Sequence, residues 1–84
     1  MTKILVEIVC PSTGRHYDFW LAKKLTVDSA IEKLAFEIQH CENNTSLFNN
    51  TRDLILFKAP CYILDRKTSL LQLGIKSGDT LVLI

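Results

Sequence analysis

Two cysteine–histidine pairs are the residues of this chain whose types could support catalysis. Cys10 and His16 flank the same predicted turn, and His40 directly precedes Cys41. A nucleophilic cysteine needs a base within hydrogen-bond reach, a third group that orients the base, and a pocket for the substrate. Sequence neighbours on a helix point apart, and the rim of a hairpin offers no pocket. We therefore expect buried or incidental thiols, and we predict no catalytic residues.

Metal, cofactor and nucleic-acid chemistry is not indicated either. Cys10, Cys41 and Cys61 form an odd set with no C-x-x-C spacing and no clustered histidines. Such a set favours reduced thiols in the cytoplasm over a disulfide framework or a zinc site. The sequence shows no paired carboxylates and no glycine-rich phosphate loop, so we expect no cofactor. Ten Lys and Arg are scattered among nine Asp and Glu, which is not a nucleic-acid footprint.

Length and hydropathy set the class of protein. The chain has 84 residues, of which 48% are hydrophobic and 23% charged. This composition suits one globular domain over residues 1–84 and excludes a disordered chain. No run approaches the ~20 consecutive apolar residues that cross a bilayer. Glu7 interrupts the first apolar run, so we predict no signal peptide, no membrane insertion and a cytoplasmic location.

Alternation, turn residues and helical spacing predict the elements that would position any site. Residues 3–9 alternate as a strand, residues 11–14 form a turn, and residues 16–21 pair back as the second strand of a hairpin. Thr26 is a predicted N-cap, after which apolar residues recur at helical spacing as far as His40. The later predicted elements are an Asn-rich loop over 42–52 and strands over 54–57, 62–64 and 80–84. This order predicts an α+β fold, with a mixed sheet of four to five strands and one main helix packed across it.

Aromatic residues are expected to anchor the core. Tyr17, Phe19 and Phe57 are assigned to it. Phe36 lies opposite the main apolar stripe of the helix, where it would face water. We expect the loop over residues 42–52 to fold back over Phe36.

The element order, the helix start at Thr26 and the closing pattern Leu70…Ile75…Leu81 resemble ubiquitin over nearly the whole chain. Residues 10–21 (CPSTGRHYDFWL) are similar to the YukD/EsaB proteins, which are small ubiquitin-like proteins of Gram-positive type VII (WXG100/ESX) secretion systems. The hairpin of that family likewise carries an aromatic-Asp-apolar-x-Leu strand. The resemblance implies a ubiquitin-like β-grasp fold and a non-enzymatic, non-conjugated accessory or regulatory protein. Its expected partners are cytosolic domains of the membrane components of the secretion system.

Two other functions remain open. A covalent ubiquitin-like modifier or sulfur carrier needs a free C-terminal Gly-Gly tail, whereas this sequence ends on Ile84 at the end of a predicted strand. We therefore disfavour conjugation. A structural homo-oligomer formed through the outer face of the sheet is the other alternative, since such an interface would bury the same apolar residues.

The outer face of the predicted sheet is apolar, although an open sheet with a helix on one side normally presents polar residues on the other. In a ubiquitin-like sheet, superposition places Ile84 beside Leu56 and Val82 beside Lys58. A patch of several hundred Å² usually marks an interaction site, and aromatic anchors such as Trp20 are common hot spots. The predicted protein-binding residues are Leu5, Trp20, Leu54, Leu56, Lys58, Val82 and Ile84.

Overall fold

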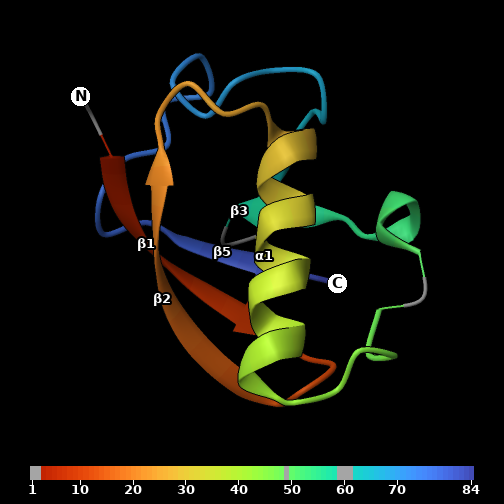
Figure 1. Cartoon of the computed structure of the whole chain (residues 1–84). Coiled ribbons are helices and arrows are strands. Elements are labelled where there is room, and N and C mark those ends of the chain that lie inside the picture. Colours follow the sequence, from red (N-terminus) through yellow and green to blue (C-terminus); the bar gives the residue numbers. More distant parts are fainter. Residues whose placement is uncertain (1–2, 49, 59–61) are drawn as a thin grey trace.

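A five-stranded sheet and one α-helix form the described part of the chain, residues 3–48, 50–58 and 62–84 of a computed structural model (Figure 1). Cys61 lies outside the described residues. In chain order the elements are β1 (Lys3–Cys10), β2 (Arg15–Ala22), α1 (Val27–Cys41), the 3-10 turn η1 (Thr51–Asp53), β3 (Leu56–Lys58), β4 (Tyr62–Ile63) and β5 (Thr80–Leu83).

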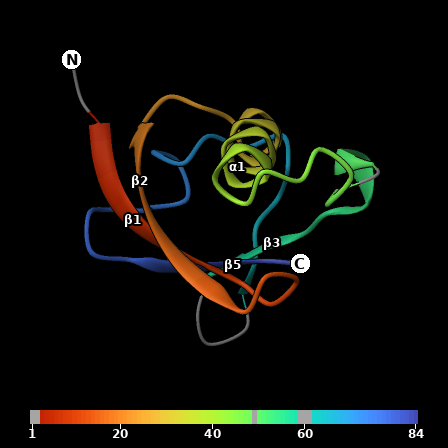
Figure 2. The same cartoon turned by 60° about the horizontal axis from the view of Figure 1, so that its bottom comes forward.

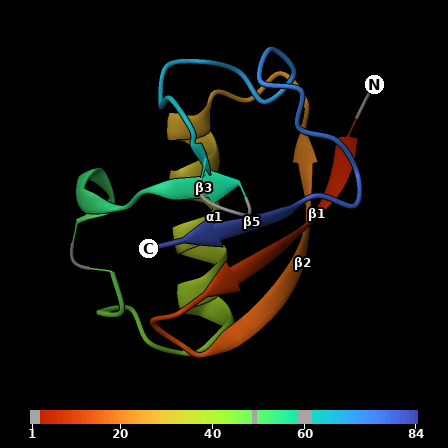
Figure 3. The same ribbon diagram turned by 180° about the vertical axis from the view of Figure 1, so that it is seen from behind.

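The strands lie side by side in the order β2-β1-β5-β3-β4. β1 and β5 run parallel, and the other neighbouring pairs run antiparallel. α1 packs across one face of this mixed sheet (Figures 1 and 2). Figure 3 shows the opposite face, across which no described helix runs. The α+β β-grasp architecture predicted from the sequence is confirmed.

The first hairpin forms where turn chemistry and alternation agree. The N–H groups of Thr13 and Gly14 donate to the carbonyl of Cys10 at 3.1 and 2.9 Å. Gly14 has a φ of 70°, a left-handed conformation that glycine adopts without a Cβ clash. Beyond this turn β1 and β2 pair without a break from Cys10↔Arg15 to Lys3↔Ala22. The predicted hairpin is therefore confirmed, and Tyr17 and Phe19 pack against the core as predicted.

The helix begins at its predicted cap. The Thr26 hydroxyl accepts the N–H of Ser29 at 3.2 Å, and Asp28 places a negative charge in the first turn. α1 then continues to Cys41, one residue beyond the predicted end at His40. Its buried stripe faces the sheet and consists of Val27, Ala30, Ile31, Leu34, Ala35 and Ile38. Fully or almost fully buried residues of β1, β2, β3 and β5 pack against this stripe to form the core.

The loop after α1 does not cover Phe36, so that prediction is wrong. The Phe36 side chain is 60% exposed, and its ring meets His40 edge-on with centroids 4.5 Å apart. Leu47 and Phe48 pack against the core instead. The side-chain oxygen of Gln39 accepts the N–H of Phe48 at 3.0 Å, which holds the loop beside the end of the helix. The two apolar loop residues therefore extend the core, and Phe36 stays in water.

Arg66 joins α1 to the segment that leads into β3. Its guanidinium contacts the Asp28 carboxylate through Nε at 2.9 Å and Nη2 at 2.5 Å. Nη1 donates to the carbonyl of Leu54 at 2.7 Å, and Nη2 reaches the carbonyl of Thr51 at 3.3 Å. A planar guanidinium can satisfy several acceptors at once. This contact fixes where the chain enters β3.

Candidate functional site

β3 pairs with β5 one residue away from the predicted register. Leu56 lies opposite Leu83, and Phe57 lies opposite Val82. Ile84 exchanges backbone hydrogen bonds with Ile55, at 2.9 and 2.7 Å, and does not lie beside Leu56. Because side chains alternate with a period of two residues, a shift of one residue moves each side chain to the other face. The predicted faces of β3 are therefore reversed.

Leu54, Leu56 and Lys58 do not belong to the outer face, so these three predictions are wrong. Leu56 is fully buried under α1, and Leu54 packs against the same core. Lys58 lies opposite Leu81, which is also fully buried, and its Nζ reaches Asp79 Oδ2 at 3.4 Å at the rim of that face. Phe57, which was assigned to the core, lies half-buried on the outer face.

Cross-strand pairing builds a continuous apolar surface on the outer face. Val9 of β1 lies opposite Val82 of β5, Val82 lies opposite Phe57 of β3, and Phe57 lies opposite Ile63 of β4. Residues that oppose each other on neighbouring strands project from the same face of the sheet, so these side chains form one row across four strands. Ile55, just before β3, and Ile84, just after β5, oppose each other two residues farther along and add two more apolar side chains to the same face. We call this surface the outer-face cluster; it consists of Val9, Ile55, Phe57, Ile63, Val82 and Ile84.

Three members of the cluster are open to solvent: Ile63 is 64% exposed, Ile84 53% and Ile55 41%. Phe57 and Val82 are half-buried between them, and Val9 is half-buried at the β1 end of the row. The cluster thus has a partly buried centre and exposed sides. A binding partner would cover apolar area there without any rearrangement of the core.

A polar band borders the cluster. Glu7 of β1 lies opposite Asp18 of β2 and Thr80 of β5. The Thr80 hydroxyl donates to Glu7 Oε1 at 3.1 Å, and His16 Nδ1 lies 3.0 Å from Glu7 Oε2. Hydrogen bonds from His16 and then Thr80 hold the pKa of Glu7 below its ordinary value of 4.5. The band supplies charged and hydrogen-bonding groups along one side of an otherwise apolar surface.

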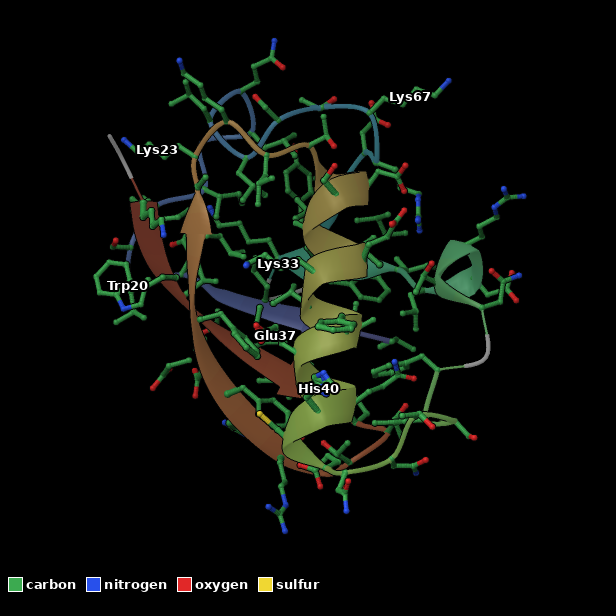
Figure 4. All side chains as sticks on the ribbon, viewed as in Figure 1. Trp20, Lys23, Lys33, Glu37, His40 and Lys67 are labelled. Atoms are coloured by element: carbon green, nitrogen blue, oxygen red, sulfur yellow. The ribbon has the colours of Figure 1, made fainter. Side chains whose placement is uncertain are left out.

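Leu5 and Trp20 lie beyond this band. They oppose each other across β1 and β2, with Leu5 36% and Trp20 59% exposed. Figure 4 shows the Trp20 ring extending away from α1, as predicted. The structure therefore divides the predicted set of residues. Val82 and Ile84 belong to the outer-face cluster, and Leu5 and Trp20 form a separate apolar pair.

The predicted binding residues did not include Val9, Ile55, Phe57 or Ile63. Residues 54–57 are all apolar, so alternation could not say which of them faces the core. Tyr62, Ile63 and Leu64 are likewise all aromatic or apolar, and only the burial of Leu64, which is 3% exposed in the structure, shows that its neighbour Ile63 faces outward.

The structure separates the candidate catalytic residues. Cys10 is fully buried on the core face of β1, whereas His16 lies on the outer face of β2 beside Glu7. Cys41 is exposed at the end of α1, while the neighbouring His40 packs on Phe36.

Within residues 3–48, 50–58 and 62–84, no three His, Cys, Asp or Glu side chains gather closely enough to hold a metal ion. In the same residues, no helix has the length and hydropathy needed to cross a membrane.

Solved structures of ubiquitin-like domains share this fold. The ubiquitin-like domain of EccD5 from Mycobacterium xenopi superposes with a TM-score of 0.80 at 17% identity, covering 100% of this chain and 94% of its own. The ubiquitin-like domain of the Mycobacterium tuberculosis type VII secretion system protein EccD1 gives 0.74 at 16% identity, covering 100% and 99%. The corresponding domain of Plasmodium falciparum Dsk2 gives 0.73 at 18% identity, covering 98% and 96%.

No family model matches the chain, and no curated protein is significantly similar to it in sequence. The chain has the ubiquitin-like β-grasp fold, and its structural neighbours include the ubiquitin-like domain of a type VII secretion system protein.

Proposed function

We propose that this domain is a non-enzymatic, non-conjugated protein–protein interaction module and an accessory component of a type VII secretion system. Two observations support the secretion role. Residues 10–21 resemble the YukD/EsaB hairpin, and the fold is similar to the ubiquitin-like domains of EccD5 and EccD1. The proposed partner is a cytosolic domain of a membrane component of that system, and no chemical step takes place on this chain.

The outer-face cluster is the observation that carries the binding role. Single apolar residues on a protein surface are ordinary. Here, however, Val9, Val82, Phe57 and Ile63 oppose one another in an unbroken row from β1 to β4. A contiguous apolar patch of this kind usually marks an interaction surface.

The surroundings of the cluster suit a specific interface. Interfaces commonly combine an apolar centre with a polar rim that sets orientation. Glu7 and Thr80 provide such a rim on the β1 side, since they are already tied to each other by a hydrogen bond. The regular sheet underneath holds the apolar side chains in place before binding, so little conformational entropy is lost.

Affinity capture with matched variants tests this proposal. Tagged wild-type protein, Ile63→Asp, Ile84→Asp and the helix-face control Phe36→Asp are each used on detergent-solubilised lysate, and retained proteins are identified by mass spectrometry. We expect the wild type and Phe36→Asp to retain secretion-system components and the two cluster variants to lose them. Equal retention by all four proteins would place the binding site elsewhere, and retention of no secretion component would overturn the role.

The molar mass of the same proteins distinguishes self-association through this face. If the outer-face cluster binds a second copy, the wild-type mass rises with concentration, and Ile63→Asp and Ile84→Asp abolish the rise. Binding to a secretion component predicts no change in mass between wild type and these variants.

A further inference from the structure

β2 lies along the outer margin of the sheet (Figure 3) and has one neighbouring strand, β1. The pairing on the far side of β1 reveals which backbone groups of β2 are free. Glu7 donates its N–H to Asp79, and Leu5 accepts the N–H of Gly78, so the odd-numbered residues of β1 bond toward β5. In an antiparallel pair, successive residues of a strand direct their backbone groups to opposite sides. The even-numbered residues of β1 must therefore bond toward β2.

The register between β1 and β2 then assigns the free groups. The even residues of β1 lie opposite the odd residues of β2, for example Val6 opposite Phe19. His16, Asp18 and Trp20 therefore direct their N–H and C=O groups away from the sheet. Among the described residues these backbone groups make no hydrogen bond. All three side chains are exposed, so the edge is accessible.

This edge lacks most of the features that usually prevent strand pairing. Natural edge strands are kept apart by short length, proline, a bulge or charged side chains, and of these β2 carries only charges, at Arg15 and Asp18. β4, at the other margin, has only two residues. β2 has eight residues, contains no proline, and keeps an unbroken register with β1. Half-buried Tyr17 and Phe19 lie under this edge and pack against the core, so an added strand would cover further aromatic surface.

We propose that β2 pairs with β2 of a second copy of this chain, antiparallel and about a two-fold axis, to form one sheet that continues through both copies. A two-fold interface uses the same patch on both partners. Two copies of one outward-facing edge can exchange N–H···O=C bonds in that arrangement. The outer-face cluster lies on the other strands and stays open in such a dimer, so this inference does not depend on the proposed function.

The charges on β2 select the register. Residues whose backbone N–H and C=O groups point away from β1 must lie opposite such residues of the second copy, because only these groups can bond across the new interface. A two-fold axis at Asp18 would oppose two carboxylates, and an axis at Phe19 would oppose Arg15 with Lys23. An axis at Tyr17 instead opposes His16 of each copy with Asp18 of the other, which places an imidazole beside a carboxylate twice.

An axis at Leu21 would oppose Asp18 with Lys24, but axes at Leu21 or His16 pair only three residues of each β2, whereas an axis at Tyr17 pairs five. One other axis, at Trp20, also pairs five residues. An axis at Trp20 would leave Asp18 opposite the uncharged Ala22 and would oppose His16 with Lys24. Cross-strand pairs of opposite charge are favourable, and like charges directly opposite are unfavourable. We therefore assign the axis to Tyr17.

Sedimentation equilibrium of the full chain between roughly 1 μM and 1 mM, a range that covers dissociation constants of weak to moderate complexes, tests the dimer. We expect a molar mass that rises from monomer to dimer. Asp18→Pro removes the outward N–H without removing a bond to β1, and proline is tolerated at such edge positions. Asp18→Pro should raise the dissociation constant of the dimer at least about tenfold. Asp18→Ala, which removes only the charge, should raise it less. A wild type that stays monomeric over the whole range would overturn the proposal.

Charge exchange tests the register without relying on proline. Asp18→Lys replaces the carboxylate opposite His16 by an ammonium, and His16→Asp opposes two carboxylates, so each should weaken the dimer. The double variant His16→Asp/Asp18→Lys restores opposite charges and should recover dimerisation, provided circular dichroism shows the native fold. Failure of the double variant to recover would contradict the Tyr17-centred register. Loss of the dimer in Ile63→Asp would assign self-association to the outer-face cluster instead of β2.

Discussion

Phe57 of β3 lies directly opposite Val82 of β5, on the face of the sheet that α1 leaves open. This pair connects Val9 of β1, which lies opposite Val82, with Ile63 of β4, which lies opposite Phe57. Without it the apolar surface would be interrupted in the middle. The same register buries Leu56 completely on the other face. One pairing therefore determines both the core contribution of β3 and the composition of the outer-face cluster.

Alanine substitutions in β3 test this register through stability. Leu56→Ala removes a fully buried side chain and should lower the free energy of unfolding by about 2–5 kcal/mol. Ile55→Ala removes a side chain that is 41% exposed and should cost less than ~1 kcal/mol. Urea denaturation of the two variants measures both values. A larger loss for Ile55→Ala would mean that the opposite face of β3 is buried.

The contact of Tyr17 with Glu42 predicts an alkaline loss of stability. Tyr17 Oη lies 2.6 Å from Glu42 Oε2, linking β2 to the end of α1. Burial, and then the hydrogen bond to Glu42, raise the pKa of Tyr17 above 10.0. Because the folded state holds the proton more tightly, this group contributes stability that is complete below the unfolded pKa and is lost as pH rises through the folded pKa.

Tyr17→Phe should reduce that alkaline loss. The variant has no proton to release, so its free energy of unfolding should change less with pH above about 10, the reference pKa of tyrosine. At neutral pH the lost hydrogen bond should cost about 0.5–1.5 kcal/mol. Urea denaturation at a series of pH values measures both effects. An alkaline slope identical to that of the wild type would show that the Tyr17–Glu42 contact does not contribute to it.

The polar band predicts an acid loss of stability. Hydrogen bonds from His16 and Thr80 lower the pKa of Glu7 below 4.5. A carboxyl with a lowered pKa contributes stability that is present above its unfolded pKa and is lost as pH falls through its folded pKa. Glu7→Gln should therefore flatten the dependence of melting temperature on pH below 4.5. Asp53→Asn, on the exposed turn η1, is the control and should leave that dependence as in the wild type.

The Arg66 contact predicts a local loss of order. Arg66→Ala leaves the carbonyl of Leu54 and the carboxylate of Asp28 without their donor. Because the side chains of Arg66 and Asp28 are 31% and 53% exposed, solvent screens the ion pair, and we expect a loss of about 1–2 kcal/mol.

Hydrogen exchange identifies where that loss occurs. Amide exchange should accelerate first around η1 and the start of β3, the segment that Arg66 joins to α1. Arg66→Lys should restore little, since an ammonium cannot bridge the same acceptors in the planar arrangement. Lys67→Ala, an exposed neighbour, should exchange as the wild type does. Uniform acceleration over the whole chain would contradict a local role.

Several elements could be predicted from local sequence because each carries its own signal. The polar Glu7 marks the outer face of β1, so its neighbours Val6 and Ile8 had to face the core. Thr26 is an N-cap whose side chain satisfies a free helical N–H, and Gly14 permits the left-handed turn of the hairpin. In each case a few adjacent residues contain the whole physical reason, and the structure agrees.

The orientation of β3 required the tertiary structure. Leu54, Ile55, Leu56 and Phe57 are all apolar, so either alternate pair satisfies a core pattern. Pairing with β5 decides between them, since Leu83 and Leu56 are both fully buried beneath α1. That choice depends on residues almost thirty positions apart in the sequence, and local alternation carries no information about it.

The sequence by itself determined the order of the α+β elements, the hairpin, the helix and the inward faces of β1 and β2, because turn chemistry, capping and alternation act between near neighbours. The β-grasp arrangement of the strands was implied by the resemblance to ubiquitin. Only the tertiary structure decided the composition of the binding face. Glu7, Asp18 and Thr80 become a polar band because three strands pair in register. Phe57 and Ile63 belong to the apolar surface because the pairing of β3 places Phe57 opposite Val82 of β5 and opposite Ile63 of β4. A surface assembled from several strands exists only once their pairing is set.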